Sequence, residues 1–248
     1  MRVQDLSWPQ YEERITTHTV VLPIGAIEAH GPHLPLSTDT VIATYLAEQL
    51  DARIPALVLP PIPFGVKTDP VRAGGEFPGM TNLRASTMTQ LVLDVLTASY
   101  RHGARRFLVL HGHIANLPVV HEAAELFLAQ APGAKVMAAA WWDFAPEDTR
   151  NDIARENGVA RSEDNHAAMV ETSLMMHIAP HQVREHLLAD DTSERRVRYL
   201  ILPVPDALKT RTGVIYQAGK ASADIGHRLL PEIIDQLVQA VNLELGDE

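Results

Sequence analysis

The chain has 248 residues, a length that suits one large α/β domain or two small ones and is ample for a buried core. Acidic residues outnumber basic residues by 31 to 21, and the formal net charge of -10 disfavours binding to nucleic-acid phosphates. The sequence contains no apolar run long enough to cross a bilayer and no apolar signal region at its start, so we expect a cytoplasmic protein without nucleic-acid or membrane partners. Because cysteine is absent, any metal ion must be bound by nitrogen and oxygen.

Strand and helix patterns alternate along most of the chain. Short apolar runs bounded by Pro and Gly predict buried strands, whereas apolar residues at helical spacing predict amphipathic helices. Strands are expected at 18–25, 56–65, 105–113 and 135–142, and helices at 40–53, 83–103, 117–133, 166–180 and 225–245. This order predicts a mostly parallel sheet with helices on both faces.

The organisation of the chain indicates a single domain over residues 1–248. The sequence contains no internal repeat, no low-complexity tract and no clear linker. Only residues 66–81 and 189–220 look irregular. The helix at 40–53 is expected to be capped by Asp39 or Thr38, because short polar side chains accept hydrogen bonds from free amides at a helix start.

Side chains that can bind metal ions follow several of the predicted strands. Glu28 and His30 come after the first strand, and residues 111–113 (His-Gly-His) end the third. Asp39 lies at a helix start, and residues 141–143 (Trp-Trp-Asp) end the fourth strand. The carboxyl ends of parallel strands share one edge of a sheet, so these groups are expected to meet there. Imidazole and carboxylate ligands together suit Zn, Mn, Fe or Co.

Each of these residues also has a structural interpretation. Asp39 alone fits a helix cap, Glu28 fits a solvated loop charge, and His111 and His113 compete for one ligand position. Glu28 and His30 point the same way only if the backbone between them is extended. The remaining histidines considered are interpreted as structural or surface residues: His33, His102, His121, His177, His181 and His186.

Long motifs give the sequence a resemblance to a known family. The segment "LPIGAIEAHGPHLPLSTD" (22–39) resembles the signature of the creatininase family, which includes creatinine amidohydrolases. "EFPGMTNL" (76–83), "RRFLVLHGHIAN" (105–116) and "NHAAMVETSLMM" (165–176) resemble further family motifs in the same order. "LSWPQYEE" (6–13) also fits, and the resemblance is weakest over 189–220.

The resemblance implies a three-layer αβα sandwich with a mostly parallel sheet, assembled as a homo-oligomer, typically a hexamer. It implies a hydrolase with two divalent metal ions (Zn, Mn or Fe) that acts on a small-molecule substrate. By residue match, the implied metal ligands are Glu28, His30, Asp39 and His113, with Asp39 bridging the two ions, and His166 is the proton-shuttling histidine.

The match also leaves positions to be assigned. Ala115 stands where creatininase has a further glutamate ligand, and Glu171 is our candidate replacement. His166 and Glu171 are about 140° apart around a helix, so they converge only if His166 precedes the regular helix. Asn116 is expected to orient His113 from outside the ligand set. Trp142 and Glu163 are the candidate substrate contacts, whereas Ser162 occupies the place of an aromatic residue that closes over creatinine.

The expected reaction is hydrolysis of an amide C–N bond. A metal-activated hydroxide attacks the carbonyl carbon, and His166 returns the proton to the leaving nitrogen. The implied substrate is a small cyclic or formyl amide similar to creatinine. Alternatives within the family are a formamide deformylase, a mycofactocin-type peptidase and a hydrolase of cyclic ketoses.

Three further interpretations are considered. A non-catalytic Rossmann-like binding protein is disfavoured, because "GAIEAHG" replaces the glycine-rich phosphate loop. A family member that has lost catalysis is disfavoured by the retained ligands and His166. A flap at 65–77 is expected near the site, where Lys67, Arg72 and His33 either meet an anionic group or are ordinary loop residues.

Overall fold

Buried residues of the central β-strands alternate between two hydrophobic cores. The structure, a computed structural model, describes residues 1–68, 75–195, 197 and 199–246. In strand β1 (Thr19–Ile24), Val21 faces one core, whereas Val20 and Leu22 face the other. Successive side chains of a strand point to opposite faces, so a strand buried on both faces is apolar throughout.

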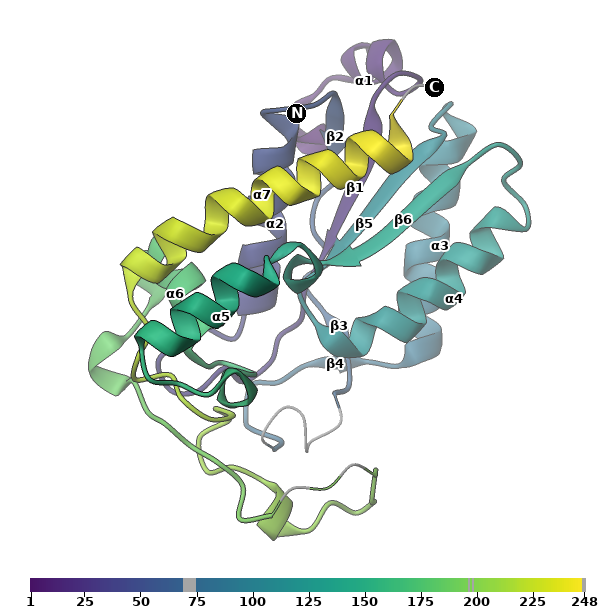
Figure 1. The fold of residues 1–248 in the computed structure, drawn as a ribbon. Helices are drawn as coiled ribbons and strands as arrows, with labels where there is room; N and C mark the ends of the chain where they lie inside the picture. Colours follow the sequence, from purple (N-terminus) through teal and green to yellow (C-terminus); the bar gives the residue numbers. More distant parts are fainter. Residues whose placement is uncertain (69–74, 196, 198, 247–248) are drawn as a thin grey trace.

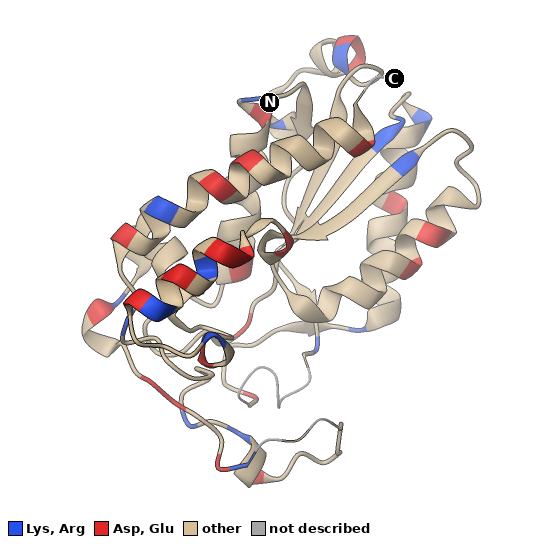
Figure 2. Cartoon of the chain, in the orientation of Figure 1, with Lys and Arg blue, Asp and Glu red and all other residues tan. Residues whose placement is uncertain are grey.

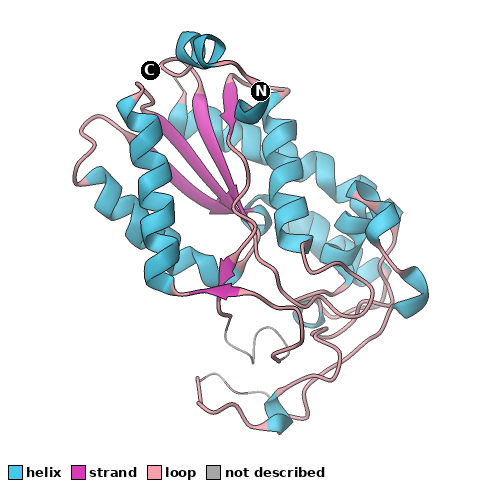
Figure 3. Cartoon of the chain, turned by 180° about the vertical axis from the view of Figure 1, so that it is seen from behind, coloured by secondary structure: helices cyan, strands magenta, loops and turns pink. Residues whose placement is uncertain are grey.

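The central sheet is parallel and has the order β2-β1-β5-β6. Its other strands are β2 (Ala56–Val58), β5 (Arg106–His111) and β6 (Lys135–Ala140). Figure 3 shows that these strands run in the same direction. Ile24 at the end of β1 pairs with His111 at the end of β5, so the segments that follow both strands emerge side by side.

Helices cover both faces of this sheet and make the three layers visible in Figure 1. One face packs against α2 (Thr38–Asp51), α6 (Met169–Ile178) and α7 (Ala223–Leu245). The opposite face packs against α3 (Ala85–Arg101) and α4 (Leu117–Leu128). The three-layer αβα fold class is therefore confirmed, whereas the single domain stays a prediction.

Several predicted boundaries need correction. The strand expected at 56–65 ends at Val58, because the following prolines have no amide hydrogen for a ladder. Its last residue instead joins a separate two-stranded pair, β3 (Gly65–Val66) with β4 (Asn82–Leu83). The helices α1 (Trp8–Arg14) and α5 (Glu147–Glu156) were not predicted; α5 is rich in charged residues and lacks a strong apolar pattern. Figure 2 shows acidic and basic residues interspersed along α5.

The start of α2 also differs from the prediction. The helix begins two residues early, with Ser37 rather than Asp39 or Thr38 at the capping position. The Thr38 hydroxyl donates to the backbone carbonyl of Pro35 at 2.7 Å. Asp39 therefore lies inside the first turn, and its side chain is 2% exposed, so it is not an exposed cap.

Two glycines let the first turn of α2 dock onto the ends of the central strands. A Cβ atom on Gly112, directly after β5, would overlap the backbone of Asp39, and one on Gly25, directly after β1, would overlap that of Thr40. Only a residue without a side chain permits this approach. The contact fixes Asp39 beside the segments that follow both strands.

Gly112→Ala is expected to lower the free energy of unfolding by about 3 kcal/mol or more, because the methyl group collides with backbone that cannot move aside. Gly133→Ala is the control, because its Cβ meets nothing within 4 Å although its φ is 77°. That change should cost only about 1 to 2 kcal/mol of backbone strain. Equal losses in urea titrations of the two variants would contradict the docking argument.

Candidate metal centre

Asp39 lies between two histidines and two glutamates that come from three other segments of the chain. Its Oδ1 atom is 3.1 Å from His30 Nε2, which is also 3.6 Å from Glu171 Oε2. Its Oδ2 atom is 3.1 Å from His113 Nδ1, which is 2.9 Å from Glu28 Oε2. All five residues are buried. We call them the Asp39 cluster.

The hydrogen bonds of the two histidines decide which ring nitrogen faces the carboxylates. His30 Nδ1 is 3.2 Å from the carbonyl oxygen of Glu28, and His113 Nε2 is 3.0 Å from that of Val66. A carbonyl oxygen only accepts, so each of these nitrogens carries a hydrogen. In the neutral ring, the lone pair of the other nitrogen then points into the Asp39 cluster, as a metal ligand requires.

The donor set therefore fits divalent cations. His30 Nε2 and Asp39 Oδ2 are buried, and neither makes a well-aligned hydrogen bond despite the short distances around them. Lone pairs that converge without hydrogen bonds suit a shared positive charge. Two ligand groups, each with atoms within 4.8 Å of one another, share Asp39: Glu28, Asp39 and His113 form one, and His30, Asp39 and Glu171 form the other.

The pKa shifts of His113 and Asp39 in the protein without a cation also indicate a site that favours positive charge. Burial lowers the pKa of His113, but the carboxylates of Asp39 and Glu28 beside its ring outweigh burial and raise that pKa to about 10. Burial likewise raises the pKa of Asp39, but His30 and His113 hold it well below its usual range. Negative carboxylates are thus stabilised here by positive charge on their neighbours.

Two polar side chains outside the Asp39 cluster hold it in place. The Thr68 hydroxyl donates to Glu28 Oε1 at 2.6 Å and lies 2.9 Å from His113 Nε2. Asn116 accepts from the Val66 amide at 3.0 Å and donates to the Gly25 carbonyl at 3.0 Å. Asn116, expected to orient His113, makes no direct hydrogen bond to the His113 ring among the described residues. Asn116 instead accepts from the amide of Val66, the residue whose carbonyl oxygen contacts His113, and so acts on the ring indirectly.

His166 lies beside the Asp39 cluster because it precedes the regular part of α6. Ala167 has a φ of 53°, a left-handed turn between His166 and the helix. Its amide donates to Glu171 Oε2 at 2.7 Å. His166 thus precedes the regular helix, as the helical geometry required, and lines the same cavity as Glu171. The His166 ring centroid is 4.3 Å from that of His30, and its Nε2 is 2.8 Å from the Ala29 carbonyl oxygen.

A cavity of about 510 Å³ is lined by His166 and by every member of the Asp39 cluster except His30. Trp142, a candidate substrate contact, lines this cavity, and its ring meets His111 edge-on at 5.7 Å. Glu163 instead lines a neighbouring open groove, where its carboxylate accepts from Gln217 Nε2 at 2.9 Å. The substrate roles of both residues stay predictions.

Of the residues proposed to meet an anion, Lys67 and His33 do not line this cavity. Lys67 is exposed and pairs with Glu76 at 3.1 Å. His33 is buried against the Thr172 hydroxyl at 2.9 Å, and burial lowers its pKa to about 4. Arg72 lies outside the described residues. Of the two competing histidines, His113 joins the cluster, whereas His111 Nδ1 is 3.1 Å from the His113 carbonyl oxygen.

Sequence reasoning missed several polar residues of the cavity wall, among them Thr68, Arg150, Arg161 and Asp164. Thr68 belongs to the flap that was expected near the site, but a single threonine in a loop carries no recognisable signal. Arg150 and Arg161 lie on or beside the unpredicted helix α5. Only the folded chain shows that they reach the same cavity.

A parallel α/β sheet whose strand ends bring imidazoles and carboxylates into one cavity is typical of a metal-dependent α/β enzyme. The family model for creatininase, described as creatinine amidohydrolase, matches residues 4–241. The chain therefore belongs to the creatininase family, and the resemblance seen in the motifs is confirmed. Homologues in this family include amidohydrolases that act on C–N bonds, so the expectation of an enzyme is also confirmed.

Individual relatives agree over nearly the whole chain. Creatinine amidohydrolase of Pseudomonas putida is 30% identical over 250 residues, which cover 98% of this chain and 96% of the relative. The mycofactocin precursor peptide peptidase of Mycobacterium tuberculosis is 28% identical and covers 91% of this chain and 85% of the relative. A solved structure described as "Creatininase Mn" aligns with a TM-score of 0.93 at 29% identity, covering 99% of both chains.

Thr68→Val should weaken binding of Zn²⁺ or Mn²⁺ by about 10- to 100-fold, because Glu28 and His113 lose the hydroxyl that orients them. Competition with a chromophoric chelator measures this affinity. Thr81→Val is the matched control, since Thr81 is exposed and its hydroxyl reaches only the Gly79 carbonyl at 3.5 Å. An unchanged affinity in Thr68→Val would exclude Thr68 from supporting the cluster.

Proposed function

We propose that this chain is a binuclear metal-dependent amidohydrolase that cleaves the C–N amide bond of a small cyclic or formyl amide. One observation carries the proposal: Asp39 is shared by two groups of metal-binding side chains beside His166 and a cavity. When bound, two divalent ions, Zn, Mn or Fe, would supply an activated water and polarise the amide carbonyl oxygen.

The residues of the chain would bind the two ions and transfer the proton. Glu28 and His113 would hold one ion, His30 and Glu171 the other, and Asp39 both. Glu171 thereby takes the place of the ligand missing at Ala115. His166 stands next to this cluster, and an imidazole can take a proton from the attacking water and give it to the leaving nitrogen. The wall that contains Trp142 excludes bulk water from the substrate.

The wider features of the proposal follow the family. Creatinine is one candidate substrate, and the peptidase relative supports amide bonds of other kinds. No helix of the described residues is both long and apolar enough to cross a membrane. The cytoplasmic location and the homo-oligomer, a hexamer by resemblance, stay predictions.

Removal of metal tests the proposal directly. We expect purified protein to bind about two equivalents of Zn²⁺, Mn²⁺ or Fe²⁺ per chain, and chelation to abolish hydrolysis of lactams, formamides or short peptides. Elemental analysis before and after dialysis against chelator gives the stoichiometry. Full amide hydrolysis by metal-free protein would overturn the proposal.

His166→Ala is expected to keep both metal ions and to lose about 10²- to 10⁴-fold in kcat, because proton transfer to the leaving nitrogen loses its carrier. Metal analysis and steady-state rates on the same preparation separate the two effects. His177→Ala, on the exposed side of α6, provides the control. Unchanged turnover would remove His166 from the mechanism, and loss of one ion would make it a ligand.

A further inference from the structure

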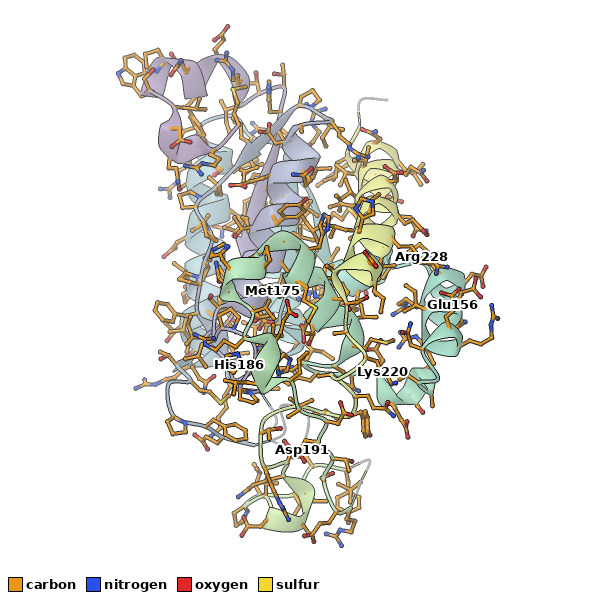
Figure 4. The ribbon with its side chains drawn as sticks, turned by 90° about the vertical axis from the view of Figure 1, so that its left-hand side faces the viewer. Glu156, Met175, His186, Asp191, Lys220 and Arg228 are labelled. Carbon is orange, nitrogen blue, oxygen red and sulfur yellow. The ribbon has the colours of Figure 1, made fainter. Side chains whose placement is uncertain are left out.

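Two arginines line the cavity beside the Asp39 cluster. Arg150 comes from α5, and Arg161 comes from the short turn that follows it. Helix α5 is fixed to α7 by two contacts: Arg228 Nη1 donates to Glu156 Oε2 at 2.7 Å, and the Thr149 hydroxyl donates to Glu232 at 2.6 Å. Figure 4 shows Glu156 and Arg228 on facing helices.

Each of the two guanidinium groups has an N–H donor without a hydrogen-bond acceptor among the described residues. Arg161 reaches Asp164 through Nη1 at 3.4 Å, and Arg150 reaches Glu147 through Nη2. The Nε–H groups of both arginines, and the indole N–H of Trp141 in the same wall, are buried without an acceptor among the described residues. Because the protein does not hold either Nε–H, each guanidinium can turn towards the cavity without breaking a bond at that nitrogen.

The chemistry of these groups defines the ligand. Guanidinium and indole N–H groups only donate, so their partner must be rich in acceptors. Asp164, the carboxylate that pairs with Arg161, is already bonded to the Val170 amide at 3.0 Å. Glu147 is 61% exposed, so its pairing with Arg150 is weakened by water. Because carboxylates of the Asp39 cluster line the same cavity, repulsion disfavours a phosphate dianion more than a monoanion.

We infer that Arg150 and Arg161 bind a carboxylate of the substrate, so that the amide cleaved belongs to an N-acyl amino acid or a lactam acid. The inference rests on the proposed amidohydrolase function for the reacting bond, and on the cavity wall for the carboxylate. The planar fork of arginine matches the two oxygens of a carboxylate, and such bonds are shorter and stronger than neutral ones.

Paired probes that differ only in charge test the inference. N-formylglycine is compared with N-formylglycinamide, and pyroglutamate with pyroglutamamide, on protein loaded with Zn²⁺ or Mn²⁺. Affinity is measured by calorimetry, which needs no turnover, and kcat/KM is measured wherever hydrolysis occurs. We expect at least one carboxylate to bind about 10- to 100-fold more tightly than its neutral partner.

Arg150→Gln and Arg161→Gln should each remove most of that preference while the metal content stays unchanged. Arg155→Gln on the same helix is the matched control, because Arg155 is 74% exposed, does not line the cavity and carries the same charge. Arg150→Lys and Arg161→Lys keep the charge but lose the fork, so they should retain only part of the preference. The lysine variants also decide the question if a glutamine variant fails to fold.

The outcomes separate the inference from the proposed function. Equal binding of both members in each pair, or a preference that survives both glutamine variants, would overturn the carboxylate assignment. Preferential carboxylate binding with no hydrolysis of any amide would support the assignment and overturn the amidohydrolase. Hydrolysis without any preference for the carboxylate probe would support the amidohydrolase and overturn the carboxylate assignment.

Discussion

The site depends on the close contact between the first turn of α2 and the ends of β1 and β5. Gly25 and Gly112 remove the two side chains that would separate helix from sheet. The helix start then brings Asp39 to the point where Glu28 and His30 follow β1 and His113 follows β5. Between β1 and β5 the strand order changes direction: β2 follows β1 on one side, and β6 follows β5 on the other. Open α/β sheets bind ligands at such a switch point.

The residues around Asp39 are each fixed by a contact with a group outside the Asp39 cluster or by the backbone. The backbone carbonyls of Glu28 and Val66 fix the two imidazoles, Thr68 fixes a glutamate, and the left-handed turn at Ala167 fixes Glu171. The resulting concentration of buried charge is unstable without a compensating cation or proton. A site of this kind is thus organised before a cation arrives, which favours tight binding.

The elements with strong local patterns could be predicted from the sequence. The central strands and the long helices have apolar runs or helical spacing that no other structure accommodates, and their order implies a parallel sheet. Helix α5 escaped prediction because its sequence is largely charged and it packs through few residues, among them Ile153. The strand expected up to residue 65 failed because consecutive prolines interrupt pairing, a local rule that its apolar content concealed.

The sequence by itself determined the family, because long creatininase motifs run through the chain. It also indicated the candidate ligands Glu28, His30, Asp39, His113 and Glu171, and His166 as the candidate proton carrier. Only the tertiary structure decided how they combine: which ring nitrogen faces inward, how Asp39 lies between two groups, and that Arg150 and Arg161 join the same wall. The reason is physical. Residue identity fixes the chemistry of a ligand, but distances between segments far apart in sequence depend on how helices and strands pack.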